Sequence, residues 1–152
     1  MPMREAQMII DEWFLAAPEA KKYLDSCVEQ LKHNGLFTTP MGRSRRFGVI
    51  SGDREQQNEC KNFTIQSIAS DLTLLSAMRL EDLIAPYNAR IVNMVHDSIV
   101  IEIENDRNKV ENVSKLVYNI MEEIPKEYLN TDIPFKCEIK YGYNWGEMKE
   151  IC

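Results

Sequence analysis

The sequence has few of the features that mark fibrous, disordered or membrane proteins. Only 6 Gly and 6 Pro occur in 152 residues, which excludes a collagen-like or low-complexity chain, and a hydrophobic fraction of 44% excludes intrinsic disorder. No apolar run approaches the roughly 18–20 residues that a membrane span requires, and the first residues carry no apolar segment of a signal peptide. We therefore expect a soluble cytoplasmic chain with one compact core and no membrane partner.

Cysteine pairs and positive charge are also scarce. The 4 cysteines are far apart and form no Cys-x-x-Cys pair, so the sequence favours neither a zinc site nor a disulfide scaffold, and we expect reduced thiols. Lys and Arg total 18 against 24 Asp and Glu, which gives a net charge of −6. This balance argues against a basic coat for nucleic acid, because non-specific affinity comes from neutralising phosphates, although it leaves room for a local basic patch.

Apolar residues recur at helical spacing in the first third of the chain, on either side of a proline. We expect one helix over residues 4–17 and a second from Pro18 to a stop at Gly35, since proline suits a first helical turn and glycine suits the position after a last one. Two amphipathic helices joined by so short a break are expected to pack as a helical hairpin.

Two short strands are expected next, over 36–39 and 46–50, around the most basic part of the sequence. This part carries Arg43, Arg45 and Arg46. On an acidic chain such a cluster indicates a loop that faces phosphate groups, because a guanidinium binds phosphate through two parallel hydrogen bonds. The same pattern is equally typical of a solvated hairpin tip, and both interpretations stay open at this point.

The remaining pattern predicts a long helix over 53–84, strands over 90–95 and 99–103, a helix over 107–124 and a last strand over 135–141. The long helix is expected to bury an apolar face made of Ile65, Ile68, Ala69, Leu72, Leu75 and Leu83. This order of elements predicts an α+β fold in which antiparallel β-hairpins pack with long helices.

Only His96, Asp97 and Ser98 separate the two strands of the second expected hairpin. A carboxylate at such a tip is held rigidly and faces outward, as metal-assisted phosphoryl transfer requires of the groups that bind divalent cations. Aspartate is also a common turn residue, because its side chain can bond to its own backbone, and His96 suits the role of an ordinary polar turn residue. The turn by itself does not decide between these roles.

The segment 95–102 resembles motif C of the family A (DNA polymerase I-like) DNA polymerases. Residues 62–71 are similar to the family's Asn-x-Pro-Ile-Gln-Gly-x-x-Ala-Asp segment, and residues 39–46 are similar to its Thr-x-x-Gly-Arg-x-Arg element. Residues 5–18 and 142–145 match further landmarks in the expected order. The resemblance covers nearly the whole chain and implies the C-terminal palm and fingers portion of such an enzyme.

The resemblance implies a role for each matching residue. Asp97 would bind catalytic Mg²⁺ in a two-metal mechanism, and His96 would lie at the terminal nucleotide of the primer. Asn62 and Gln66 would reach the minor groove of the primer–template, where all base pairs present similar acceptors. The basic residues that would lie near the nucleic-acid backbone are Arg43, Arg45 and Arg46.

Two positions depart from the family pattern. Ser98 follows the motif C aspartate where the family has glutamate, and Asn58 stands where the family has arginine. Arg54, one helical turn earlier, is a candidate substitute for that DNA contact. Within a single partial polymerase domain, we expect fingers-like helices and the basic hairpin in 1–62, and the palm-like helix, motif C hairpin, helix and last strand in 63–152.

The sequence holds neither the second metal-binding aspartate of motif A nor the helix that grips the incoming nucleotide. One aspartate cannot build a two-metal site, so we expect this chain alone to be inactive. The resemblance therefore implies the C-terminal fragment of a DNA-directed DNA polymerase, which acts in DNA replication on primer–template DNA with Mg²⁺. Its activity would require an N-terminal polymerase chain that supplies the missing parts.

The surface that faces those missing parts should be unusually apolar, so the isolated chain is expected to self-associate. Phage genomes often break up polymerase genes, which favours a phage or prophage origin and the cytoplasm of a bacterial or phage-infected cell. The alternative is a non-catalytic remnant that binds DNA or another protein, and Ser98 and Asn58 favour it slightly. Retention of Asp97 together with His96 and the two amide residues favours the polymerase.

Overall fold

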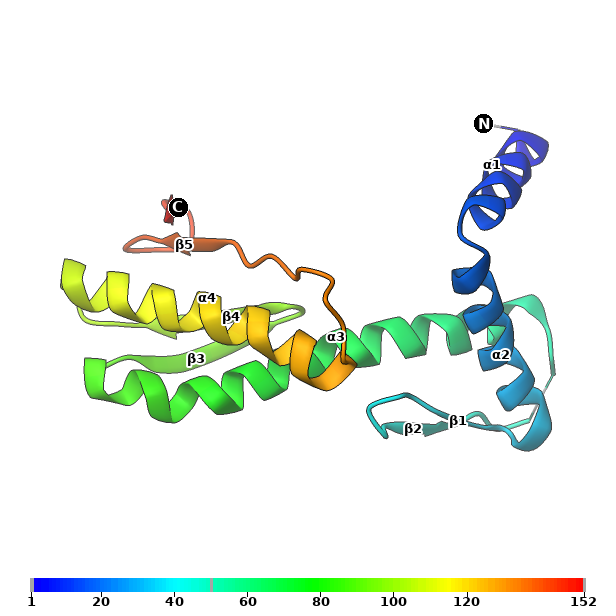
Figure 1. Ribbon diagram of the computed structural model, residues 1–152, viewed down its shortest axis with the longest axis horizontal. Coiled ribbons are helices and arrows are strands. Elements are labelled where there is room, and N and C mark those ends of the chain that lie inside the picture. The colour runs from blue at the N-terminus through cyan, green and yellow to red at the C-terminus, as the bar shows by residue number, and fades with distance from the viewer. Residues whose placement is uncertain (1, 50, 152) are drawn as a thin grey trace. The chain divides into compact units, whose positions relative to one another are not determined.

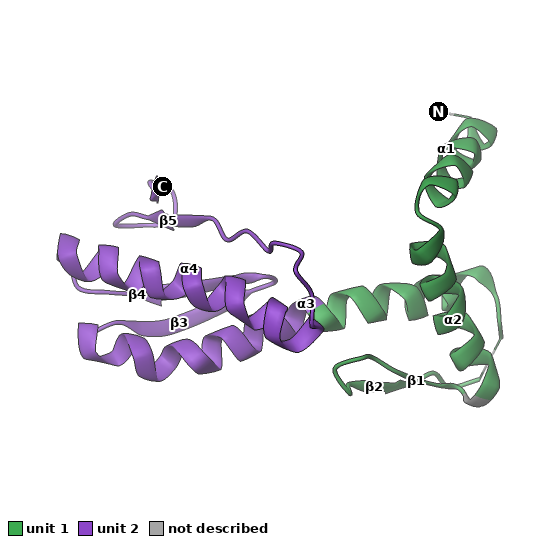
Figure 2. Ribbon diagram, viewed as in Figure 1, with its two compact units in different colours: residues 1–68 green, residues 69–152 purple. Residues whose placement is uncertain are grey.

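The computed structural model describes residues 2–49 and 51–151 and has an α+β fold, as predicted. In chain order the elements are α1 (Met3–Ala16), α2 (Pro18–Asn34), β1 (Leu36–Thr38), β2 (Ser44–Arg46), α3 (Arg54–Ile84), a 3₁₀ turn (Ala85–Tyr87), β3 (Arg90–Val95), β4 (Ser98–Glu102), α4 (Arg107–Leu129), β5 (Ile139–Tyr141) and β6 (Lys149–Ile151) (Figure 1). Contacts divide the chain into two compact units, Met1–Ile68 and Ala69–Cys152, with the boundary inside α3 (Figure 2). The functional subdivision at residues 62 and 63 stays a prediction.

The first two helices begin and end close to the predicted residues. Pro18 opens α2, and Gly35 ends it in the left-handed conformation, with φ of 63° and its N–H donating to the carbonyl of Leu31. The predicted helical hairpin is wrong, because α1 buries none of its residues and Trp13 is 55% exposed. Only Ala17 separates the helices, which is too short a link to reverse the chain, and Figure 1 shows α2 continuing in the general direction of α1.

A small core in the first unit joins α2, β1 and the N-terminal half of α3. Its buried members are Cys27, Leu31, Phe37, Phe47 and Cys60, with Phe63 packed against them. The Phe63 ring meets Phe37 and Phe47 edge to face, at centroid distances of 6.3 and 6.5 Å. Phe63 therefore fixes this part of α3 against the β1–β2 hairpin.

The first β-hairpin is present, but its second strand lies earlier than expected. β1 pairs with β2 in antiparallel register, Phe37 opposite Arg45. The strand predicted over 46–50 is observed as Ser44–Arg46, so the predicted position is wrong, and Ile50 lies outside the described residues. Phe47 has the aromatic character that is typical of a strand residue, which explains the misplaced prediction. In the structure Phe47 follows the end of β2, and its ring is buried in the core.

The long helix is confirmed as α3, whereas the predicted apolar face is largely wrong. Only Leu72 of that set is buried, and the others are exposed or half-buried: Ile65, Ile68, Ala69, Leu75 and Leu83. The buried side combines other apolar residues, chiefly Leu80 and Ile84, with small hydroxyl residues. Thr64, Thr73 and Ser76 each donate a hydrogen bond to the carbonyl four residues earlier. A hydroxyl satisfied in this way can be buried at little cost, which a hydrophobic pattern does not register.

The second unit contains the predicted motif C hairpin. β3 pairs with β4, and Val95 faces Ser98 across a turn of only His96 and Asp97. Ser98 thus belongs to a strand rather than to the turn. After it α4 begins at the Asp106 cap and runs to Leu129, beyond the predicted end at residue 124.

The C-terminal strand is shorter than predicted and has a partner that the sequence pattern does not indicate. The strand expected over 135–141 is observed only as Ile139–Tyr141, paired with Lys149–Ile151. In the described residues the strands form three separate two-stranded antiparallel sheets. Across residues 2–49 and 51–151, none of the helices is both long enough and apolar enough to span a membrane.

Candidate nucleic-acid interface

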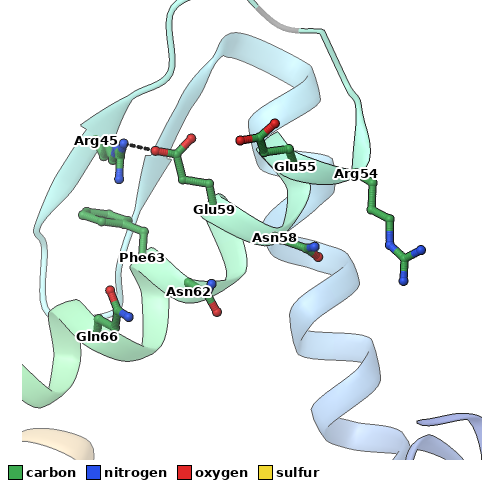
Figure 3. A pocket seen from close by; sticks show the side chains of 8 residues that line it. All are labelled: Arg45, Arg54, Glu55, Asn58, Glu59, Asn62, Phe63 and Gln66. Carbon is green, nitrogen blue, oxygen red and sulfur yellow. Dashed lines mark hydrogen bonds and ion pairs between the residues drawn. The ribbon is translucent and has the colours of Figure 1, made fainter. Parts of the chain in front are cut away.

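An open pocket of about 730 Å³ lies on the first unit, between β2 and the N-terminal part of α3 (Figure 3). Its lining is mostly polar or charged and consists of Arg45, Arg54, Glu55, Asn58, Glu59, Asn62, Phe63 and Gln66. All but Arg45 come from a single helix, so the periodicity of α3 determines how these side chains are arranged.

The α3 residues of the pocket form two parallel rows. The first, the polar row, contains Arg54, Asn58, Asn62 and Gln66, and the second contains Glu55, Glu59 and Phe63. Residues four apart lie on the same face of a helix, and a rise of about 1.5 Å per residue separates successive members by about 6 Å. Figure 3 shows the polar row following α3 from Arg54 to Gln66. Hydrogen-bonding groups therefore recur at a regular interval along one line.

The polar row is available to a ligand. All four side chains are exposed. Within residues 2–49 and 51–151, the amides of Asn58, Asn62 and Gln66 have no intramolecular hydrogen-bond partner and Arg54 has no ion pair. Each amide offers both donors and an acceptor, so the row can bond to acceptor groups on a ligand without breaking a bond inside the protein.

Arg45 reaches the pocket from β2 and is held on three sides. Its guanidinium forms an ion pair with the Glu59 carboxylate (Figure 3). Its central carbon lies 4.9 Å from the ring centroid of Phe47 and 5.5 Å from that of Phe63, within the range of cation–π attraction. Arg45 is therefore anchored on the core of the first unit rather than moving freely at a hairpin tip.

The other two arginines of the basic cluster lie elsewhere. Arg46 is exposed and follows Arg45 directly in β2, so its side chain points to the opposite face of the strand. Arg43 precedes the strand, and its backbone N–H donates to the buried Thr39 hydroxyl at 3.2 Å. Of the basic residues singled out in the sequence, the structure brings Arg45 and Arg54 to the pocket but not the other two.

The predicted catalytic residues lie in the second unit, at the tip of the β3–β4 hairpin. His96 and Asp97 are both exposed, and His96 has φ of 56°, the left-handed conformation that a two-residue hairpin turn requires. In the described residues the Asp97 carboxylate accepts no hydrogen bond, so the turn does not use it as an internal cap. The side chain remains available to a ligand.

These residues do not make a metal site by themselves. Among residues 2–49 and 51–151 no group of three or more His, Cys, Asp or Glu side chains lies close enough to hold an ion. Mg²⁺ in proteins commonly takes one or two carboxylates and completes its shell with water and phosphate oxygens. Asp97 can thus supply one ligand to a metal site that it shares with other groups, but it cannot supply a complete set of ligands.

Sequence reasoning overlooked the second row of the pocket. Glu55, Glu59 and Phe63 share the four-residue spacing of the polar row, and that spacing is the signal that groups them. The ion pair between Arg45 and Glu59 joins strand β2 to helix α3 at the surface, and periodicity within single elements does not predict such a contact.

The chain is similar to polymerases over nearly its full length. The family model for DNA polymerase family A matches residues 1–147. The DNA polymerase of Escherichia phage T5 is 30% identical over 159 residues, covering 96% of this chain and 18% of that protein. The thermostable DNA polymerase I of Thermus aquaticus is 26% identical over 155 residues, covering 99% of this chain and 18% of that protein.

A solved structure shares the fold. It is the POL domain of Pol1 from M. smegmatis in complex with DNA primer-template and dNTP, with a TM-score of 0.71 at 23% identity, covering 82% of this chain and 23% of that chain. The chain spans less than a fifth of the length of the curated relatives described above. By the match over residues 1–147, the chain belongs to DNA polymerase family A.

Proposed function

We propose that this chain is the C-terminal part of a DNA-directed DNA polymerase and takes part in template-directed nucleotidyl transfer during DNA replication. The observation that carries the proposal is the polar row, which places three exposed amides, unpartnered among the described residues, along one helix of a family A chain. The row presents groups suited to a regularly repeating polar ligand, and duplex DNA is such a ligand.

Asn62 and Gln66 bind the minor groove of the primer–template. Base pairs of either kind present acceptors there, so amide donors can follow the shape of the pair without reading the sequence. Successive residues of the row are about 6 Å apart, close to two steps of the roughly 3.4 Å spacing along a DNA strand. Arg45 and Arg54 at the pocket bind backbone phosphates, which sets the position of the protein on the duplex.

Asp97 supplies one carboxylate to Mg²⁺ in the completed active site, and His96 lies at the terminal nucleotide of the primer. Bound Mg²⁺ would act as a Lewis acid toward phosphoryl oxygens. The support from this chain is the position of Asp97, because a two-residue turn between paired strands fixes it and no internal hydrogen bond occupies it in the described residues. The hairpin holds the carboxylate, and a partner must supply the remaining ligands.

That partner is an N-terminal polymerase chain carrying motif A and the nucleotide-binding helix. Large apolar side chains on α1 support it: Met8 is 54% exposed, Ile9 56% and Trp13 55%. Such a face is typical of a surface that another protein covers, and without the partner it promotes self-association. The second candidate, a non-catalytic remnant, is favoured by Ser98, because a hydroxyl stands where the family carries a carboxylate.

Binding of a fluorescein-labelled hairpin primer–template, followed by fluorescence anisotropy at low salt, tests the proposed DNA contacts. Replacing Asn62 and Gln66 together by alanine is expected to weaken binding about thirtyfold, since each of the two lost hydrogen bonds contributes about 1 kcal/mol. The matched control replaces Asn112 and Asn119, two exposed asparagines of α4, and should leave binding unchanged. Equal binding by both double variants, or no binding by the unaltered chain, would contradict the proposal.

A further inference from the structure

The pocket has no net charge, although its proposed ligand is a polyanion. Two arginines, Arg45 and Arg54, stand with two glutamates, Glu55 and Glu59. Glu59 neutralises Arg45 directly through the ion pair, whereas Glu55 has no ion pair within the part of the chain that the structure describes. The two carboxylates therefore differ in whether they engage the arginine of β2.

The geometry of the pair leaves Arg45 accessible but occupied. The Arg45 and Glu59 side chains are 42% and 47% exposed, so a phosphate can approach them from solvent. A guanidinium can donate two parallel hydrogen bonds to a phosphate through either of two edges, and the nitrogen Nη2 belongs to both edges. Glu59 accepts a hydrogen bond from this nitrogen of Arg45. The rings of Phe47 and Phe63 keep the guanidinium in place, so it cannot turn away from Glu59 toward a different ligand without losing these contacts.

We propose that Glu59 competes with the DNA backbone for Arg45, and that this competition sets how tightly the chain holds a duplex. In the free protein Glu59 acts as a positioning residue that keeps Arg45 over the two rings. On binding, a phosphate must displace the carboxylate or share the guanidinium with it, so Arg45 contributes less affinity than an unpaired arginine would. This inference rests on the proposed DNA-binding function.

The competition is tested with a double-mutant cycle on the whole chain. The proteins are the unaltered chain, Glu59→Gln, Arg45→Ala and the double variant, each titrated into the labelled hairpin primer–template over a salt series. Glu59→Gln is expected to bind about two- to fivefold more tightly, the range that an exposed ion pair supports. Its plot of log affinity against log salt should steepen by about 0.9, because one more phosphate contact releases one more counterion.

The decisive comparison is the effect of Glu59→Gln without Arg45. In the Arg45→Ala background, the gain in affinity and the steeper salt dependence should both disappear. Glu55→Gln is the matched control, because it removes the same charge one helical turn away and should have the same effect with and without Arg45. If Arg45→Ala unfolds the chain, as judged by circular dichroism, Arg45→Gln replaces it, since glutamine keeps part of the stem that packs on the rings.

An equal effect of Glu59→Gln in both backgrounds would overturn the inference, because the carboxylate would then act only by repelling phosphate. No change in affinity or salt dependence would overturn it as well. Failure of the proposed function has a different signature: the unaltered chain would not bind the primer–template, or the polar-row variant would bind as tightly as its control.

Discussion

Gly142 lies in the loop between β5 and β6, where no side chain fits. A Cβ atom there would lie 2.6 Å from the carbonyl oxygen of Glu147 and 3.0 Å from the Cα of Met148, both of them backbone atoms. Gly142→Ala should therefore destabilise the chain by about 1–3 kcal/mol. Gly48→Ala is the control, because a Cβ at Gly48 meets nothing within 4 Å, and it should change stability by less than about 0.5 kcal/mol. Urea unfolding followed by circular dichroism checks both, and equal midpoints would contradict the prediction.

Cys60 is expected to make the stability of the first unit depend on pH in the alkaline range. Burial raises the pKa of its thiol to about 11. In the unfolded chain the thiol ionises near pH 8.5. The folded state is therefore stabilised fully below that pH, and this stabilisation is lost as the pH rises toward about 11. Cys60→Ala should lower overall stability yet flatten the loss between these values. Unfolding measured across the range checks this, and parallel pH profiles for the two proteins would contradict it.

At the scale of elements, α4 illustrates how one residue fixes a helix start. The Asp106 carboxylate accepts hydrogen bonds from the backbone N–H groups of Asn108 and Lys109, at 2.8 and 3.1 Å. Asp106→Ala should cost about 1 kcal/mol, whereas Asp106→Asn keeps an acceptor and should cost little. Urea unfolding compares the variants, and similar losses for alanine and asparagine would contradict a capping role.

Element boundaries were predictable where a residue with special backbone chemistry marks them. Pro18 and Gly35 mark the ends of α2, and Asn88 in the left-handed conformation follows the 3₁₀ turn after α3. The end of α4 was not predictable, because its helix continues through Pro125, which is buried. Packing compensates there for the hydrogen bond that proline cannot donate, and packing is not visible in sequence.

The candidate site was predictable only in part for a similar reason. The resemblance to the polymerase family singled out Asn62 and Gln66, and helical spacing then extends the same row to Arg54. The pairing of Arg45 with Glu59 depends on how β2 packs against α3, which is a tertiary contact. Periodicity places residues on one face of an element but does not say what lies opposite that face.

At the scale of the whole molecule, we expect the exposed apolar face of α1 to govern association. We expect the isolated chain to self-associate with rising concentration, and Trp13→Glu, which places a charge on that face, to reduce this. Ile133→Glu is the matched control, since Ile133 is 66% exposed outside α1 and its replacement should have no such effect. Sedimentation velocity over a concentration series checks both. A chain that stays monomeric throughout, or an equal effect of the two variants, would contradict this role of α1.

Primer extension with Mg²⁺ and all four deoxynucleotides tests the proposed polymerase function directly. The chain is assayed alone and mixed with a candidate N-terminal polymerase chain from the same genome, with Asp97→Ala as the variant and Asp132→Ala, an exposed aspartate outside the hairpin, as its control. We expect extension only in the mixture, abolished by Asp97→Ala and retained by Asp132→Ala. No extension by a verified folded complex would contradict a catalytic role, and extension by this chain alone would contradict the requirement for a partner.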